Sequence, residues 1–109
     1  MQIQEFQKLI EAIYYKKDSA RGLEGTFMWF AEEFGELTRA LRRGHQDELE
    51  GEFADVFAWL VSLASIAGID LEAAARRKYA AGCPRCEATP APAAEPWRSN
   101  SSRAKRPCS

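Results

Sequence analysis

The fold is decided by residues 26–43, which read TFMWFAEEFGELTRALRR. On a helical wheel of about 100° per residue, the apolar side chains of this stretch fall on one face. That face consists of Phe27, Phe30, Phe34, Leu37 and Leu41. Three carboxylates, Glu32, Glu33 and Glu36, lie beside it as a separate stripe. The spacing therefore predicts an amphipathic helix that carries a core face and an acidic face.

Helical spacing extends through the rest of residues 1–82, and no alternating strand pattern competes with it. We expect further helices at about residues 2–16, 47–67 and 71–79, the last one capped by Asp70. Thr26 is a reasonable N-cap for the central helix, and Gly44 and Gly68 are reasonable helix stops. A glycine-containing loop is expected at 18–25. Short connections imply antiparallel neighbours, so we predict an all-α bundle of about four helices.

A second acidic pair lies on the expected 47–67 helix. Glu52 and Asp55 are three residues apart, so they share one face of that helix. Clustered carboxylates repel one another unless a cation neutralises them, and an oxygen-only cluster favours Mg²⁺, with Mn²⁺ as the alternative. On the wheel Trp29 and Trp59 fall with the acids, where an indole could stack on a nucleobase. Core or interface packing is the competing explanation for both tryptophans.

Charge and hydropathy exclude some classes of function. Residues 1–82 hold 10 Lys and Arg against 14 Asp and Glu, a net charge of −4, while residues 83–109 hold 5 against 2, a net charge of +3. Because duplex binding needs a basic face, we do not expect nucleic acid as a specific partner. No stretch approaches the roughly 20 apolar residues that span a bilayer, and no apolar segment follows Met1. We therefore expect a cytoplasmic protein without a membrane partner.

The composition changes after Gly82. All five prolines and all three cysteines follow it, so we expect a helical domain at 1–82 and a flexible, disordered C-terminal tail at 83–109. The tail begins with Cys83-Pro84-Arg85-Cys86, which resembles half of a zinc knuckle. Only Cys108 follows within the chain. A complete Zn²⁺ site, a redox-active pair and ordinary thiols therefore stay open as alternatives.

These motifs resemble the MazG-type, all-α nucleoside triphosphate pyrophosphohydrolases. The resemblance covers roughly residues 1–82 and rests on Trp29-x-x-Glu32-Glu33-x-Gly35-Glu36, Glu52-x-x-Asp55-Val56, Gly68-Ile69-Asp70-Leu71 and Lys78-Tyr79. It implies Mg²⁺-dependent cleavage of a (d)NTP between the α- and β-phosphates, giving a nucleoside monophosphate and pyrophosphate. By resemblance the metal ligands would be Glu33, Glu36, Glu52 and Asp55. Glu32 would bind through water or orient the attacking water.

The same resemblance implies a homodimer or homotetramer with its sites near a subunit interface. The departing pyrophosphate needs cations, for which the candidates are Lys16, Lys17, Arg21 and Lys78, and Lys78 is preferred because of its family-like Lys-Tyr position. Surface solubility is the alternative explanation for each of them. Two other functions stay open. One is a non-catalytic helical module that binds nucleotide or a partner protein, and the other is a phosphoribosyl-ATP pyrophosphatase-like enzyme.

Overall fold

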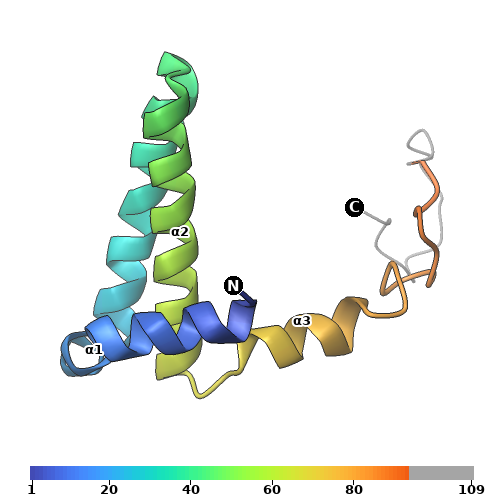
Figure 1. Ribbon diagram of the computed structural model, residues 1–109, viewed down its shortest axis with the longest axis horizontal. Coiled ribbons are helices and arrows are strands. Elements are labelled where there is room, and N and C mark those ends of the chain that lie inside the picture. The colour runs from blue at the N-terminus through green and yellow to red at the C-terminus, as the bar shows by residue number, and fades with distance from the viewer. Residues whose placement is uncertain (94–109) are drawn as a thin grey trace, which may run out of the picture. The chain divides into compact units, whose positions relative to one another are not determined.

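The computed structural model describes residues 1–93. This part of the chain is helical and contains no strand: α1 spans Ile3–Arg43, α2 spans Gln46–Ile66 and α3 spans Leu71–Tyr79 (Figure 1). The predicted all-α class is confirmed. Residues Met1–Glu72 form one compact unit, and a second unit begins at Ala73.

The expected helix count was wrong, because the predicted loop at 18–25 is almost entirely helical. Only Gly22 leaves the helical conformation, with φ 87° and ψ 170°, and α1 changes direction there (Figure 1). This backbone conformation is essentially restricted to glycine, so one residue makes the bend that a longer loop was expected to make. Thr26 is therefore not an N-cap. It lies inside α1, is fully buried, and donates a hydrogen bond from Oγ1 to the backbone oxygen of Asp18 at 3.5 Å.

The two predicted glycine stops are confirmed. Gly44 ends α1 with φ 72°, and its N–H donates to the Ala40 oxygen at 3.0 Å. Gly68 has φ 73° beyond the end of α2, where the N–H groups of Gly68 and Ile69 donate to the oxygens of Ser65 and Ala64 at 3.1 and 2.8 Å. These two bonds form a Schellman motif. The short connection after Gly44 makes α2 return antiparallel along the second half of α1 (Figure 1).

The first half of α1 packs across the C-terminal half of α2. The rings of Phe6 and Phe57 stack at 4.9 Å, and Ile10 and Val61 are buried. Gln7, which is also buried, holds the junction together. Its Nε2 donates to Ser65 Oγ at 3.0 Å and to the Ile69 oxygen at 2.8 Å, while its Oε1 accepts the Leu71 N–H at 2.9 Å. One glutamine therefore fixes the end of α2 and the start of α3.

The buried core of the first unit is small. The predicted core face is only half covered, since Phe27, Phe34 and Leu41 are each about half exposed. An open apolar groove of about 650 Å³ lies beside this face between α1 and the end of α2. Its apolar lining includes Leu23, Phe27, Met28, Leu60, Leu63 and Ile69. No single helix of the described residues is long and apolar enough to cross a membrane; α2 and α3 pass that test only when they are taken together across the break between them.

In the second unit the chain makes a tight turn around the Cys83–Cys86 motif. The Glu87 N–H donates to the Cys83 oxygen at 2.6 Å, and the Cys83 N–H donates to the Ala88 oxygen at 3.0 Å. Cys83 is half-buried and Cys86 is exposed. Most of the predicted flexible tail, including Cys108, lies outside the described residues, so the domain boundary at Gly82 stays a prediction.

Candidate metal centre and adjoining pocket

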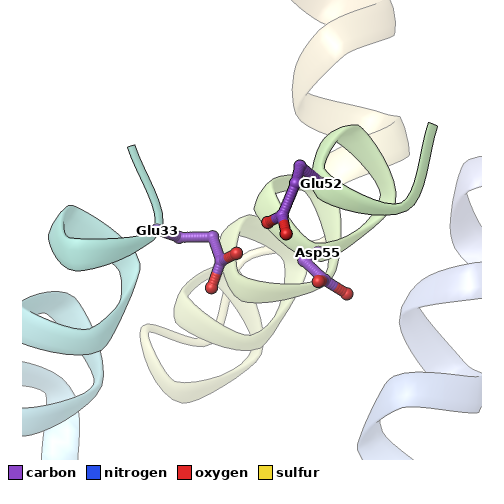
Figure 2. A group of neighbouring side chains, drawn as sticks. All are labelled: Glu33, Glu52 and Asp55. Carbon is purple, nitrogen blue, oxygen red and sulfur yellow. The ribbon is translucent and has the colours of Figure 1, made fainter. Parts of the chain in front are cut away.

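Three of the predicted acids meet where the two antiparallel helices face each other. Glu33 comes from α1, and Glu52 and Asp55 come from one face of α2. One carboxylate oxygen of each lies within 4.8 Å of the others. Figure 2 shows the three side chains converging in the space between the helices. The hairpin thus brings Glu33 to two acids that lie 19 and 22 positions further along the sequence.

The cluster is electrostatically strained in the absence of a cation. Partial burial, a hydrogen bond that protonated Glu33 would make to Glu52, and the charges of Glu52 and Asp55 raise the pKa of Glu33 from 4.5 to about 7. The Trp59 side chain opposes part of this increase by hydrogen bonding to Glu33. Burial and the charge of Glu52 also raise the pKa of Asp55. Burial and the neighbouring carboxylates thus disfavour the charged forms of Glu33 and Asp55, which a bound cation would stabilise.

The donor set suits a small divalent cation. Glu52 Oε2 is buried and has no hydrogen-bond partner among the described residues, as is expected of an oxygen reserved for a ligand. Oxygens on opposite sides of a Mg²⁺ ion are about 4.2 Å apart, close to the span of the cluster. Three carboxylates and no nitrogen or sulfur ligand favour Mg²⁺ or Mn²⁺ over softer metals. The residues present therefore fit the predicted metal.

Two predicted site residues are placed outside this cluster. The Glu36 carboxylate is paired with the Arg39 guanidinium one turn further along α1, and both side chains are about half exposed. Glu32 is exposed on the neighbouring face of α1. The structure thus brings together Glu33, Glu52 and Asp55 and leaves Glu32 and Glu36 on the helix surface beside them. Their assignment as ligand or water-orienting group stays a prediction.

A pocket of about 190 Å³ adjoins the cluster and shares Asp55 with it. The first half of α1 supplies Lys17 and Arg21 to its wall, and α2 supplies Trp59. Two of the predicted phosphate-binding cations therefore lie beside the acidic cluster. Lys16 is exposed and is not part of the wall.

The remaining cation candidate, Lys78, belongs to the second unit. Its Nζ lies 5.8 Å from the centre of the Tyr79 ring. The preference for Lys78 as a phosphate ligand stays a prediction.

The two tryptophans differ in their surroundings. Trp59 is half-buried in the pocket wall, and the Arg21 guanidinium lies 5.4 Å from the centre of its ring. Trp29 is about half exposed on α1 and is not part of the pocket wall. Of the two predicted base-stacking residues, only Trp59 therefore borders the pocket beside the acids.

Sequence reasoning overlooked three polar groups in the pocket wall: Tyr14, Asp18 and Ser62. Asp18 and Ser62 are buried, whereas Tyr14 is half exposed. One signal could have identified Asp18, because it precedes Arg21 by three residues, the spacing of a helical ion pair. It was missed because residues 18–25 were expected to form a loop.

Two comparisons with known proteins bear on this site. A search of curated proteins found no matching relative. The family model for the MazG nucleotide pyrophosphohydrolase domain matches residues 21–86, more than half of the chain, and the match contains all three clustered carboxylates as well as Arg21 and Trp59. The chain is thus a member of the MazG nucleotide pyrophosphohydrolase domain family.

Proposed function

We propose that this protein is a Mg²⁺-dependent nucleoside triphosphate pyrophosphohydrolase that converts a (d)NTP to the monophosphate and pyrophosphate. The observation that carries the proposal is the convergence of Glu33, Glu52 and Asp55 within 4.8 Å, with a buried Glu52 oxygen that lacks a partner. Membership of the MazG family supports the same reaction class. The pocket that shares Asp55 contributes Lys17 and Arg21, two cations suited to binding a polyphosphate.

Each group has a role in this proposal. Glu33, Glu52 and Asp55 hold Mg²⁺, which when bound neutralises the triphosphate and lowers the pKa of a coordinated water. Trp59 lies in the wall of the pocket beside the cluster, where its ring is available to stack on a nucleobase. Lys17 and Arg21 in the pocket wall bind the phosphate chain. A carboxylate that lies next to the cluster, Glu32 or Glu36, accepts the proton of the attacking water.

The test is release of pyrophosphate from a panel of ribo- and deoxyribonucleoside triphosphates, with Mg²⁺, with Mn²⁺ and with EDTA. We expect metal-dependent release that falls at least about a hundredfold in Glu52→Gln and Asp55→Asn, since each variant removes an anionic ligand. Asp47→Asn is the matched control, because Asp47 is an exposed carboxylate at the start of the same helix. Folded wild-type protein that binds Mg²⁺ and nucleotide without releasing pyrophosphate would instead identify the non-catalytic binding module.

We also propose that the protein acts as a homodimer or homotetramer. The apolar groove lined by Phe27, Met28 and Leu60 is open in the single chain, and exposed apolar surface of this kind is typical of subunit interfaces. Sedimentation equilibrium should give at least twice the monomer mass of 12.2 kDa. Met28→Glu, which places a charge on the rim of the groove, should shift the protein toward the monomer. A wild-type monomer at high micromolar concentration would contradict this part of the proposal.

A further inference from the structure

Asp18 is a buried carboxylate in the wall of the pocket. It is 4% exposed, and its Oδ1 accepts a hydrogen bond from an Arg21 guanidinium nitrogen at 3.2 Å. A buried charge is unfavourable unless it is paired, so the arginine is the group that makes a carboxylate tolerable at this position. The reverse also holds, because the carboxylate restricts the guanidinium to one place.

That place is defined by a second contact. The Arg21 guanidinium lies over the Trp59 ring, 5.4 Å from its centre, and Trp59 borders the same pocket as Asp55 of the acidic cluster. The contacts therefore run from Asp18 through Arg21 to Trp59. They connect the first half of α1, before Gly22, to α2.

These contacts engage the Trp59 ring but leave part of the Arg21 guanidinium available to a ligand. The Arg21 guanidinium lies over the Trp59 ring, so the Trp59 side chain takes part in positioning that guanidinium. A guanidinium has five N–H donors, and contacts with one carboxylate oxygen and one ring leave donors for phosphate oxygens. Both Arg21 and Asp55 border the same pocket of about 190 Å³.

We propose that Asp18 is a positioning residue, which acts through Arg21. It holds the Arg21 guanidinium against Trp59, at a fixed place beside the acidic cluster, where the guanidinium binds the phosphate chain of the substrate. This inference rests on the proposed function, because it assigns the pocket to the polyphosphate of the nucleotide. It adds a residue that acts through Arg21 and lies before the part of the chain matched by the family model.

The experiment is a double-mutant cycle of Asp18→Asn and Arg21→Gln, with kcat and KM measured on the best triphosphate. Affinity for inorganic pyrophosphate in Mg²⁺ is measured by calorimetry on the same proteins. Arg21→Gln should raise KM by about tenfold or more, since it removes a charge-assisted hydrogen bond to phosphate. Asp18→Asn should raise KM by about threefold to tenfold with a smaller change in kcat, because it loosens the same bond. The double variant should be no worse than Arg21→Gln alone.

A merely structural role for Asp18 predicts a different pattern. Asp18→Asn would then lower thermal stability and kcat, and its effect would add to that of Arg21→Gln; either additivity or an unchanged KM overturns the inference. Mn²⁺ affinity should remain within about twofold in both single variants, since neither residue is in the acidic cluster. Asp47→Asn is again the matched control.

Two further results separate this inference from the proposed function. If Asp18→Asn does not fold, Arg21→Lys tests the same geometry, because a lysine keeps the charge but lacks the planar fork. An unchanged KM in Arg21→Lys would then overturn the inference. If the wild-type protein hydrolyses triphosphates while the cycle is additive, only the inference fails. If the wild-type protein neither hydrolyses triphosphates nor binds pyrophosphate, the proposed function fails and the inference fails with it.

Discussion

Replacing Glu33 by glutamine should make the cation-free protein more stable at alkaline pH, although it removes a proposed metal ligand. In the folded chain the pKa of this carboxyl is raised from 4.5 to about 7 by burial and by Glu52 and Asp55. At about 1.4 kcal/mol for each unit of pKa, the ionised carboxylate would destabilise the fold by roughly 3 kcal/mol. The side chain is only partly buried, and solvent screening reduces the expected effect to about 1–2 kcal/mol.

Proton linkage determines how the effect of Glu33 on the free energy of unfolding changes with pH. Below pH 4.5 Glu33 is protonated in both the folded and the unfolded chain, so it contributes no pH dependence. Between pH 4.5 and 7 the folded chain keeps the proton that the unfolded chain has lost, so the free energy of unfolding falls as the pH rises. Above pH 7 both states are ionised and the destabilisation is complete. Glutamine removes it, so the advantage of Glu33→Gln should grow from near zero at pH 4.5 to about 1–2 kcal/mol at pH 8.

The assay is urea unfolding at fixed protein concentration in EDTA, at pH 5 and pH 8, with the same series repeated in 10 mM Mg²⁺. In Mg²⁺ the order should reverse at pH 8, because the wild-type cluster binds the cation and the variant has lost one ligand. Glu32→Gln, in which an exposed neighbour is neutralised, should stay within about 0.5 kcal/mol of wild type. The reasoning is refuted if Glu33→Gln in EDTA at pH 8 is no more stable than wild type.

Three further predictions concern the scaffold around the site. Gln7→Ala should lower the free energy of unfolding by about 2–4 kcal/mol in urea titrations, because it removes three hydrogen bonds and leaves the Leu71 N–H without its partner; a change below about 1 kcal/mol would contradict this role. Gly22→Ala should lower the free energy of unfolding by about 1–3 kcal/mol, because Gly22 has a φ of 87°. Gly51→Ala, in a helix interior with open space around it, should raise the free energy of unfolding by up to about 1 kcal/mol. Equal effects of the two variants in thermal unfolding would refute the strain argument. Arg39→Ala, which breaks an exposed pair with Glu36, should change stability by less than about 1 kcal/mol, and a larger loss in chemical denaturation would show that the pair is more than a surface contact.

The sequence predicted the parts of this fold that depend on local spacing. Acids three residues apart must share a face of one helix, as Glu52 and Asp55 do, and glycines after amphipathic runs marked the ends of α1 and α2. The prediction failed at residues 18–25, where glycine content suggested a loop. A helix continues through that stretch because Gly22 alone absorbs the change of direction.

The partners across helices were harder to predict from the sequence. Helical spacing places Glu33 and Glu36 on neighbouring parts of one face, so it could not show that Glu33 alone meets the acids of α2 while Glu36 pairs with Arg39. That distinction depends on the axial rotation of two helices against each other. Asp18 was missed for a related reason, since its burial arises only when the first half of α1 packs onto α2.

The bend at Gly22 lies between the cations and the carboxylate of α1 that the proposed reaction needs close together. Lys17 and Arg21 precede it, and Glu33 follows it. α2 contacts both halves of α1, and Asp55 belongs both to the acidic cluster and to the pocket wall. A change in the direction of the bend would therefore move the cations relative to the carboxylates without removing any of them. For this reason Gly22→Ala should reduce kcat/KM by more than its loss of stability predicts, whereas Gly51→Ala, which leaves the bend intact, should not.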